Sequence, residues 1–434
     1  MKKVLIFTYH WPPGSGPGVQ RFLKFCKYLP KYGWEPIVVT VKDGSYPSID
    51  ESLNDDIPEG LEVHKTKTFE PFTIYNALRG KKGKSVSVGL IGIKDSKSPI
   101  QKLSMHVRAN YFIPDARKGW KTYALKAAEK VINQNDIDLI ISTGPPHSTH
   151  LIGMELQEKH NIPWVADMRD PWTEIHYNKD LPRSEKTKEK DIALERKVLT
   201  TASHVITVSD GLKEQLEKYN EATSVVYNGF DEDDYKPLEP FKTEKFTLAY
   251  IGNLKPNQHI KTLWRVLLEL CNENEQFKQH FKLELTGNVH EVIVNEIKSL
   301  GLENNLNAYP FVEHKESVKR MQKSCMLLFI VPQTEKNNLI LTGKLFEYLA
   351  SGTPLLSIGP VAGNAAKIIG GCSRGTLLDY NNEIGIKESL LKAFDSWMSS
   401  SQECPQLIVN SEIEQYSRQL QTKKLVSFFD KIVE

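Results

Sequence analysis

Short apolar runs alternate with amphipathic stretches along most of the chain. This alternation is typical of parallel β-sheets whose strands are joined by crossover helices. One such helix is predicted at Val19–Lys31, where apolar residues recur at helical spacing. The strands predicted in the first half are Lys3–Tyr9, Pro36–Val41, Asp138–Ser142, Pro163–Asp167, His204–Ser209 and Ser224–Tyr227. Residues 43–115 show no clear period, and we expect them to form an irregular insertion of loops and helices.

A second series of apolar runs follows an acidic stretch at Asn228–Pro240. The strands predicted there are Phe246–Ile251, Lys282–Thr286, Leu306–Phe311, Cys325–Val331, Pro354–Ile358 and Thr376–Leu378. The sequence therefore predicts an α/β protein with two doubly wound, Rossmann-like domains at residues 1–230 and 241–410. A helix from Ile413 to about Ile432, within residues 411–434, is predicted to end the chain. Because ligands of such folds bind beyond the carboxyl ends of the strands, chemistry is expected in the loops that leave them.

Composition is that of a protein with globular domains. Of the 434 residues, 40% are hydrophobic and 25% charged, which is ordinary for such chains. No apolar run approaches the roughly 18 to 20 residues that span a bilayer, and the run after Met1-Lys2-Lys3 is too short for a signal peptide. The five cysteines are at least 32 residues apart, which disfavours metal or redox pairs and a disulfide framework. We therefore expect a cytoplasmic protein with buried, reduced thiols.

Positive charge gathers in one segment. The whole chain carries a net charge of +2, but Arg79–Lys118 holds ten Lys and Arg against two Asp, a net of +8. This concentration suggests an anionic partner, either a membrane surface or a nucleic acid, and a solvated loop is the alternative. The segment has interleaved apolar residues and no recognisable nucleic-acid module. We therefore favour peripheral, salt-sensitive association of residues 79–118 with the inner face of the membrane, and no nucleic-acid partner.

Two loops of the first half combine glycine or histidine with the start of a helix. Gly16 and Gly18, after the first strand, would let a ligand approach the backbone closely. A dinucleotide-binding fold needs an acidic residue at the end of the second strand, but Asp43 comes late, so NAD binding is disfavoured. His147 and His150 are three positions apart with no third metal ligand nearby. One histidine lining a binding site is therefore favoured over zinc.

The strand ending at Asp167 delivers Arg169, Asp170 and Trp172 to the same edge of the predicted sheet. A guanidinium, a carboxylate and an indole suit the binding of a polar, hydroxylated substrate. A structural Arg–Asp pair under an aromatic lid is an equally open reading. Asp231–Asp233 matches a D-x-D pattern that holds a metal in some sugar transferases, but an acidic, solvated turn is favoured there. We expect no metal site.

The most informative stretch is Thr342–Pro354. Gly343 and Lys344 open a predicted helix, where backbone N–H groups and an ammonium would hold a diphosphate. Glu347 lies one turn further on, and its carboxylate would accept hydrogen bonds from a ribose 2′/3′-diol. An ordinary Lys–Glu pair on a helix surface is the alternative.

Together these residues resemble the family 4 glycosyltransferases of the GT-B fold, of the type that builds bacterial surface polysaccharides. The likeness spans nearly the whole chain, and its most specific part is the run TGKLFEYLASGTPLL. The other runs that carry it are YHWPPGSGPGVQRFLKFCKYLPKYGWEPIVVT, STGPPHSTHLIG, IPWVADMRDPW, VVYNGFDEDDY and AYIGNLKPNQHIKTL. The resemblance implies that the two domains face a cleft and that the C-terminal helix packs back on the first domain.

The resemblance also implies roles for individual residues. Arg169, Asp170 and His147 become candidate catalytic residues, and Gly16 and Gly18 would line the loop for acceptor and donor phosphates. The candidate donor-binding residues are Gly343, Lys344, Glu347, Lys255 and Val312, the last in a turn against which the nucleobase rests.

A few positions depart from the family's pattern. Asn253 and Gln258 stand where the family often has an Arg and a Lys that face the diphosphate, and Lys255 would have to replace them. Leu339 occupies the first position of the family's E-x7-E pair, of which Glu347 is the second. These differences indicate a divergent branch, and an inactive relative is the alternative.

We therefore predict a glycosyltransferase that moves a sugar from a nucleotide sugar to a lipid-linked or saccharide acceptor in cell-surface polysaccharide biosynthesis. The resemblance implies retention of anomeric configuration, although the sequence identifies no nucleophile. Lys344 and helix N-termini would stabilise the leaving diphosphate without a metal or other cofactor. Two alternatives remain: a sugar-nucleotide epimerase of the same architecture, and a non-catalytic carbohydrate- or nucleotide-binding relative.

Overall fold

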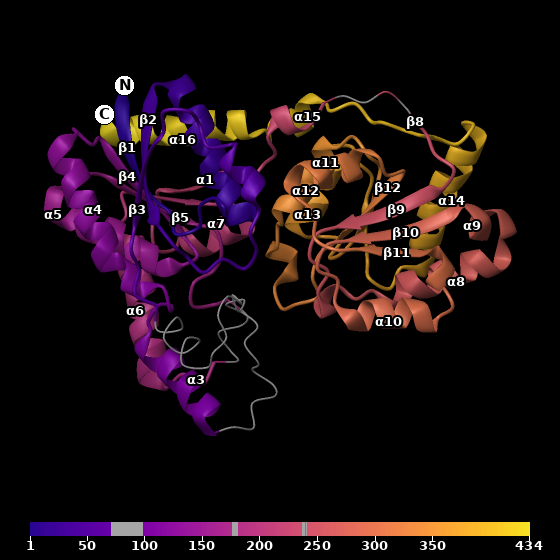
Figure 1. Ribbon diagram of the computed structural model, residues 1–434, viewed down its shortest axis with the longest axis horizontal. Helices are drawn as coiled ribbons and strands as arrows, with labels where there is room; N and C mark the ends of the chain where they lie inside the picture. The colour runs from indigo at the N-terminus through magenta and orange to yellow at the C-terminus, as the bar shows by residue number, and fades with distance from the viewer. Residues whose placement is uncertain (71–98, 176–180, 237–238, 240) are drawn as a thin grey trace. The chain divides into compact units, whose positions relative to one another are not determined.

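Two parallel β-sheets organise the chain (Figure 1). The structure, a computed structural model, describes residues 1–70, 99–175, 181–236, 239 and 241–434. Its contacts divide the chain into two units: unit 1 comprises Met1–Asn228 and Arg418–Glu434, and unit 2 comprises Gly229–Ser417. Each unit contains one of the sheets, which confirms the predicted α/β fold with two doubly wound domains.

Seven strands of unit 1 form one sheet: β1 Lys2–Phe7, β2 Trp34–Val41, β3 Glu62–Thr66, β4 Leu139–Gly144, β5 Trp164–Met168, β6 His204–Thr207 and β7 Thr223–Val225. They lie in the order β3-β2-β1-β4-β5-β6-β7, and neighbouring strands are parallel. The chain builds outward in one direction from β1 and in the other from β4. The carboxyl ends of β1 and β4 therefore meet at a topological switch point, where open α/β sheets bind ligands.

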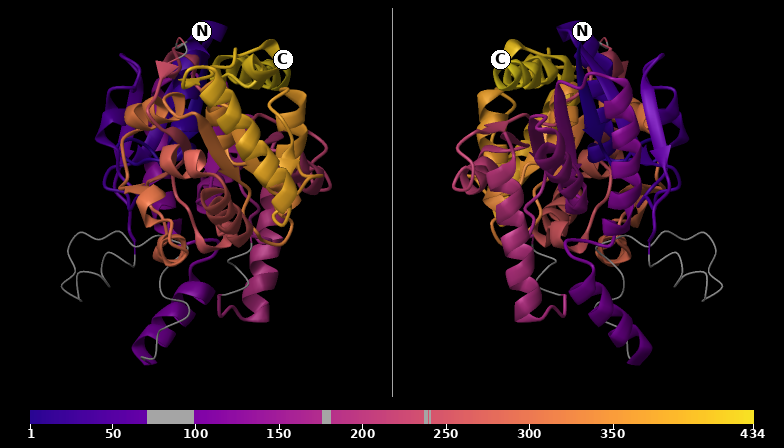
Figure 2. Two further views of the ribbon diagram at one scale, coloured as in Figure 1. Left: turned by 90° about the vertical axis from the view of Figure 1, so that its right-hand side faces the viewer. Right: turned by 90° about the vertical axis from the view of Figure 1, so that its left-hand side faces the viewer.

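Helices cover both faces of this sheet (Figure 2). The helices of unit 1 are α1 Pro17–Tyr28, α3 Pro99–Tyr111, α4 Lys121–Gln134, α5 His150–His160, α6 Glu185–Thr201, α7 Asp210–Leu216 and α16 Arg418–Val433. Because side chains alternate along a strand, Val4 and Ile6 of β1 pack in one apolar cluster with α1 and α16. Leu5 and Phe7 pack in a second cluster with α4 and α5. The C-terminal helix α16 is thus part of the core of unit 1.

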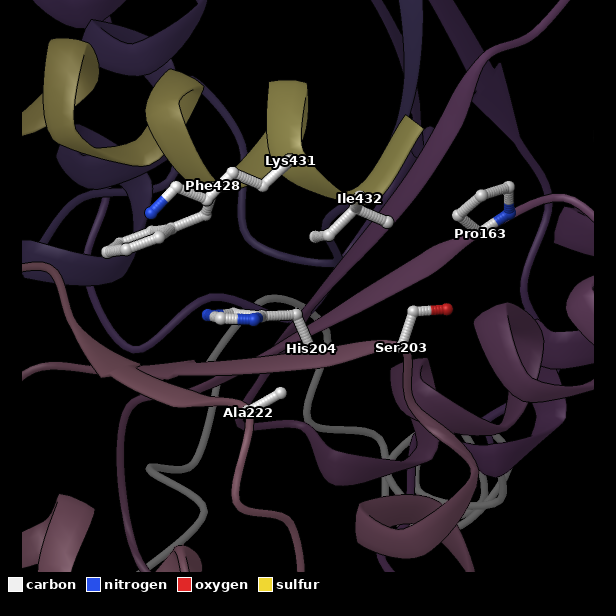
Figure 3. A pocket seen from close by; sticks show the side chains of 7 residues that line it. All are labelled: Pro163, Ser203, His204, Ala222, Phe428, Lys431 and Ile432. Atoms are coloured by element: carbon white, nitrogen blue, oxygen red, sulfur yellow. The ribbon is translucent and has the colours of Figure 1, made fainter. Parts of the chain in front are cut away.

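Helix α16 also lines an open pocket at the amino end of the sheet. A cavity of about 400 Å³ lies between α16 and the residues that precede β5, β6 and β7 (Figure 3). His204, at the start of β6, stacks on Phe428 of α16 with ring centres 5.0 Å apart. Burial and the charge of Lys431 lower the pKa of the His204 imidazole to about 4. The ring is therefore neutral at pH 7, and its stacking helps to fix α16 on the sheet.

The main sheet of unit 2 has six parallel strands: β9 Phe246–Ile251, β10 Phe281–Thr286, β11 Leu306–Tyr309, β12 Met326–Ile330, β13 Leu355–Ile358 and β14 Leu377–Leu378. Their order is β11-β10-β9-β12-β13-β14, so the switch point lies between β9 and β12. Two short strands, β8 Phe241–Lys242 and β15 Glu403–Cys404, pair antiparallel. The helices are α8 Lys261–Glu273, α9 Glu275–His280, α10 Glu291–Ser299, α11 His314–Gln322, α12 Gly343–Ala350, α13 Asn364–Gly371, α14 Glu383–Ser399 and α15 Ser411–Glu414.

Two predictions about chain segments need correction. The region 43–115 is not wholly irregular, because it contributes β3 to the edge of the sheet beside β2. Among the described residues it is an edge strand with β2 as its neighbour, and its side chains are exposed or half-exposed, so it lacks an apolar run. The helix predicted within residues 411–434 is interrupted between Glu414 and Arg418. The backbone of Phe230 bonds to Tyr416 there, and only the part from Arg418 belongs to unit 1.

The expectation of reduced thiols is wrong for two of the five cysteines. Cys325 and Cys404 form a disulfide, whereas Cys26, Cys271 and Cys372 are buried free thiols. The pairing of β8 with β15 carries Cys404 to Cys325, although 79 positions separate them in sequence. Sequence spacing could not reveal this proximity. Among the described residues, no helix is long and apolar enough to cross a membrane.

Candidate active-site residues

The glycine-rich loop of unit 1 leaves β1 at the switch point and leads into α1. Gly16 is the N-cap residue of α1 and has a φ of 111°, a conformation that favours glycine. Gly18 lies in the first turn, and a Cβ atom there would come within 2.1 Å of Nη1 of Arg169. The absence of a side chain at Gly18 therefore lets the Arg169 guanidinium lie against the helix start.

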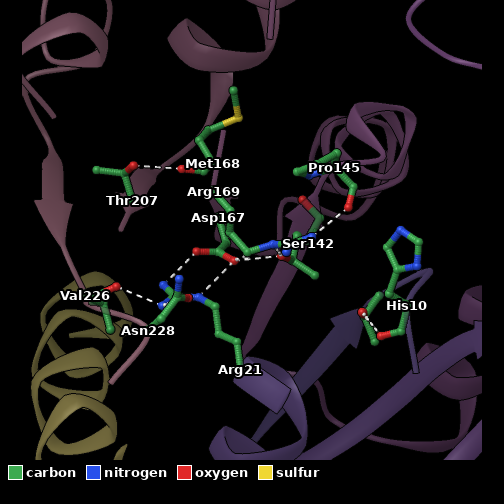
Figure 4. A network of polar contacts seen from close by, with 12 residues as sticks. His10, Arg21, Ser142, Pro145, Asp167, Met168, Arg169, Thr207, Val226 and Asn228 are labelled. Carbon is green, nitrogen blue, oxygen red and sulfur yellow. Dashed lines mark hydrogen bonds and ion pairs between the residues drawn. The ribbon is translucent and has the colours of Figure 1, made fainter. Parts of the chain in front are cut away.

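Arg169 is held by two hydrogen bonds at the carboxyl ends of β4 and β5 (Figure 4). Its Nε donates to Oγ1 of Thr143 at 3.0 Å, and its Nη2 donates to the carbonyl oxygen of Pro145 at 2.6 Å. Burial lowers the pKa of the guanidinium, while the negative charges of Asp167 and Asp170 oppose that change. The side chain remains 13% exposed, so it stays accessible to a substrate.

A fully buried ion pair lies behind Arg169. Nη2 of Arg21 in α1 is 2.9 Å from Oδ1 of Asp167 in β5, and both side chains are 0% exposed. Arg21 also donates to the carbonyl oxygens of Val226 and Tyr227, near the end of the first segment of unit 1. Neither Arg21 nor Asp167 was predicted as a site residue. The charge of Asp167 in an apolar strand was the available signal, because a buried charge needs a partner.

His147 lies in a short turn after β4 and stacks on Trp172 with ring centres 4.9 Å apart. Nδ1 of His150 is 2.9 Å from Oγ of Ser142. Burial, with the charge of Arg169, lowers the pKa of His147 to about 3 and that of His10 to about 3. The imidazoles are therefore neutral at pH 7. Arg169 is the cation beside them.

A second charged cluster lies at the same edge of unit 1. Tyr9 and Arg117 both donate to the carboxylate of Glu70, and Arg117 also donates to the carbonyl oxygen of Ser45. The Arg117 guanidinium lies 5.3 Å from the centre of the Tyr9 ring. Burial raises the pKa of Glu70, which the charge of Arg117 opposes. The charges of this cluster are thus neutralised within the protein.

In unit 2, helix α12 begins with Gly343, and Thr342 is its N-cap residue. Nζ of Lys344 lies 3.7 Å from the centre of the Tyr250 ring, at the end of β9. Desolvation lowers the pKa of the Lys344 ammonium to about 7, which the charge of Glu347 opposes. Among the described residues, neither this ammonium nor the buried Thr342 hydroxyl has a hydrogen-bond partner.

The loop after β9 leaves room for the side chain of Lys344. Gly252 has a φ of 121°, and a Cβ atom there would meet Nζ of Lys344 at 2.9 Å. The amide of Gln258 donates to Oη of Tyr250 and to the carbonyl oxygen of Ile330. Tyr250 in turn donates to the carbonyl oxygen of Asn253. Gln258 and Asn253 therefore hold the ring on which Lys344 lies, a role that was not predicted from the sequence.

Of the remaining candidates of unit 2, Glu347 acts on Lys344 through its charge, whereas Lys255 and Val312 lie apart. Glu347 is half-buried on α12, and Val312 is half-buried after β11. Lys255 is exposed at the start of a short turn, where its backbone N–H donates to the side chain of Gln258. No contact among the described residues joins Lys255 or Val312 to Lys344. Asp231 of the D-x-D pattern is buried, and its carboxylate caps a turn by accepting from the Asp233 N–H.

Two models of known protein families match the sequence of this chain. A family model described as Glycosyltransferase Family 4 matches residues 85–234, and one described as Glycosyl transferases group 1 matches residues 231–412. With two Rossmann-like units and polar groups at both switch points, the protein is a glycosyltransferase of the GT-B class. The chain belongs to the family 4 glycosyltransferases, as the sequence resemblance implied. No curated protein matches it.

Several solved structures share the fold over the whole chain. Sucrose-phosphate synthase from Thermosynechococcus elongatus is 12% identical, with a TM-score of 0.62 and 99% of each chain covered. A variant of S. aureus TarM, in complex with fondaparinux, α-GlcNAc-glycerol and UDP, is 11% identical, with a TM-score of 0.59 over 99% of this chain and 100% of that one. WaaG, a glycosyltransferase of lipopolysaccharide biosynthesis, is 13% identical, with a TM-score of 0.53 over 99% and 98%. At such identities the likeness shows the fold alone.

Proposed function

We propose that this glycosyltransferase moves a sugar from a nucleotide sugar, bound by unit 2, to a lipid-linked or saccharide acceptor, bound by unit 1. The reaction builds cell-surface polysaccharide, retains the anomeric configuration and uses no metal ion. The UDP and saccharide ligands of the TarM variant and the lipopolysaccharide role of WaaG support this choice of substrates.

The contact of Lys344 with Tyr250 is the observation that carries the proposal. Removing an ammonium from water is unfavourable unless a counter-charge is near, and desolvation lowers the pKa of Lys344 to about 7. The Thr342 hydroxyl, which has no hydrogen-bond partner among the described residues, and the first N–H groups of α12 lie at the same helix start. A diphosphate would accept hydrogen bonds from these donors and would neutralise the ammonium.

The residues then divide the chemistry between the two units. Lys344 and the start of α12 would stabilise the charge that develops on the leaving diphosphate, the part a metal ion plays in other enzymes. Glu347 would accept hydrogen bonds from the donor ribose, and Lys255 and Val312 would contact the nucleotide. Arg169 would stabilise charge at the transferred sugar, with Asp170 and neutral His147 contacting hydroxyl groups. Gly16 would leave room for the substrate, and Gly18 leaves room for the Arg169 guanidinium.

A thermal-shift panel of UDP, GDP, ADP and CDP tests the donor site, because a ligand that binds the native state raises its melting temperature. We expect one diphosphate to raise the melting temperature of the wild type and to have little effect on Lys344→Met. If none of the four raises it, the donor site is wrong. The preferred nucleotide sugar is then incubated with the protein alone. Conversion to an epimer would identify the protein as an epimerase, and an absence of turnover with every acceptor would identify a binding protein.

We further propose that residues 79–118 bring unit 1 to the cytoplasmic face of the membrane, where a lipid-linked acceptor lies. Residues 71–98 are outside the described residues, so the proposal is supported by the sequence charge and by α3. Figures 1 and 2 show α3 reaching away from the sheet of unit 1. Val107 and Tyr111 of α3 are 39% and 71% exposed, and such side chains add interfacial burial to basic charge.

Vesicle co-sedimentation tests the membrane proposal. We expect binding to vesicles that contain anionic lipid, weaker binding at higher salt, and loss of binding when Lys81, Lys82 and Lys84 become Glu. Vesicles of neutral lipid serve as the control. A protein that ignores anionic vesicles at low salt would instead act on a soluble acceptor.

A further inference from the structure

Thr143 lies between the side chain of Arg169 and the buried carboxylate of Asp167. Its hydroxyl oxygen accepts a hydrogen bond from Nε of Arg169 at 3.0 Å. The same hydroxyl donates to Oδ2 of Asp167 at 2.7 Å. Arg169 itself is 3.9 Å from that oxygen, too far for a direct hydrogen bond. The hydroxyl of Thr143 is thus the link between the two charged groups.

The direction of these hydrogen bonds follows from the donors and acceptors available. An ionised carboxylate only accepts hydrogen bonds and a guanidinium only donates them. Thr143 has one proton, which Asp167 takes, and this leaves the oxygen lone pairs for Arg169. Since Thr143 is 2% exposed, water does not compete freely for either bond. The Thr143 hydroxyl fixes the Nε side of the Arg169 guanidinium, while the carbonyl oxygen of Pro145 accepts from its Nη2.

Arg21 fixes the other end of this chain of contacts. Its Nη2 and Nε are 2.9 and 3.3 Å from the two oxygens of Asp167. Its Nη1 donates to the carbonyl oxygen of Val226 at 2.8 Å, which anchors the guanidinium to the backbone (Figure 4). Because Arg21 holds Asp167 in this way, the Oδ2 atom that accepts the hydrogen bond from Thr143 stays in one position.

We propose that Thr143 is a positioning residue for the transfer reaction. Its hydroxyl, oriented by the Arg21–Asp167 pair, sets the direction in which the Arg169 guanidinium faces the substrate. The inference rests on the proposed role of Arg169. It adds a requirement that the position of Thr143 near the end of β4 does not suggest, namely that a buried hydroxyl controls turnover rather than only stability.

Unit 1 offers a matched control for this residue. Thr207, at the end of β6, is also buried, and its hydroxyl donates to the carbonyl oxygen of Met168 at 2.7 Å. Thr207→Val therefore removes a buried threonine hydroxyl close to the same edge of the sheet without removing a partner of Arg169. Thr143→Ser keeps the hydroxyl, and Thr143→Val keeps the branched shape of the side chain without it.

The first measurement follows the Nε–H group of Arg169 and needs no substrate. In protein with isotope-labelled arginine, its NMR signal is assigned from its loss in Arg169→Lys. We expect slow exchange of this proton with water in the wild type, Thr143→Ser and Thr207→Val. In Thr143→Val we expect exchange to be about tenfold faster or more, because the acceptor is gone. Equal exchange in Thr143→Val and Thr207→Val would overturn the inference.

The second measurement compares kcat and KM for the nucleotide sugar that the wild type turns over best among UDP-glucose, UDP-N-acetylglucosamine and GDP-mannose. We expect Thr143→Val to lower kcat about tenfold with little change in donor KM, and Thr143→Ser to restore it. A fall in melting temperature without this change in kcat would show a merely structural role. If Arg169→Ala keeps full activity, the proposed role of Arg169 fails. If Arg169→Ala is impaired but Thr143→Val is not, only the positioning inference fails.

Discussion

The two units share a parallel-sheet architecture but differ in how charged side chains are paired at the carboxyl ends of their strands. In unit 1, Arg21 is paired with Asp167, and Arg169 donates to two oxygens of the protein. In unit 2, the described residues offer Lys344 a ring face and no hydrogen-bonding partner. Unit 1 therefore holds its charged groups in place before a substrate arrives, whereas in unit 2 the charge of Glu347 acts on Lys344 without an ion pair among the described residues.

This contrast matches the substrates proposed for each unit. An acceptor presents neutral hydroxyl groups, which fixed donors and acceptors recognise without a large change in charge. A nucleotide sugar carries a diphosphate, which supplies the missing negative charge at the start of α12. The following predictions test whether the edge of unit 1 controls turnover and the edge of unit 2 controls donor affinity.

Arg169→Ala should produce the largest effect. Loss of a positioned cation that stabilises charge in the transition state typically lowers turnover about 100-fold or more. We expect that fall in kcat, with donor affinity measured by calorimetry nearly unchanged, because Arg169 belongs to unit 1. Asp170→Asn should lower kcat in the same direction. A collapse of donor affinity with normal turnover of the bound complex would reverse the roles given to the two units.

Glu347→Ala should weaken nucleotide binding with the fold intact. Loss of a charged hydrogen-bonding partner is worth about 1.5 to 3 kcal/mol, which corresponds to roughly 10- to 150-fold in affinity. Calorimetry with the nucleoside diphosphate identified by thermal shift measures the change. Glu347→Gln, which keeps an acceptor oxygen, is the control and should lose less. Unchanged affinity in Glu347→Ala would remove the ribose contact from the proposal.

The pattern of apolar positions predicted most of the sheet but not all of it. The prediction for Phe246–Ile251 coincides with β9, because a strand buried on both faces is a continuous apolar run. The edge strand β3 was not predicted, because its side chains are exposed or half-exposed and an edge strand tolerates polar residues. The pattern of apolar residues depends on how deeply a segment is buried. It therefore identifies strands least well at the edge of a sheet.

The site was predicted only in part, for a related reason. Arg169 and Lys344 were predicted as site residues, because both are charged and lie in or just after loops that leave predicted strands. Tyr250 lies inside an apolar strand and looks like a core residue, and Thr143 was predicted in the loop after Ser142 without a role. Arg21 and Asp167 are 146 positions apart, and only the packing of α1 against β5 brings them together. Contacts at this sequence separation depend on topology, which local patterns do not contain.

Donor affinity should fall as pH rises above about 7. The pKa of Lys344 is lowered to about 7 without ligand, and a bound diphosphate favours the charged form and raises it. Between these two pKa values, binding must take up a proton, so affinity should fall by up to about tenfold per pH unit. Calorimetry from pH 7 to 9 measures the slope. Lys344→Arg stays charged over this range and should bind with little pH dependence.

The smallest effect is expected from Tyr250→Phe, which separates the ring from its hydroxyl. The ring face attracts the Lys344 ammonium and survives this change, so diphosphate affinity should stay within about twofold of the wild type. The hydroxyl bonds only to Gln258 and Asn253 among the described residues. Its loss should lower the free energy of unfolding by about 1 kcal/mol, measured by urea denaturation.

Tyr250→Leu removes the ring as well and should weaken diphosphate binding further, because Lys344 then loses its remaining contact. If Tyr250→Phe and Tyr250→Leu weaken binding equally, the hydroxyl network, not the ring, holds Lys344. Unit 2 would then depend on fixed hydrogen bonds in the same way as unit 1.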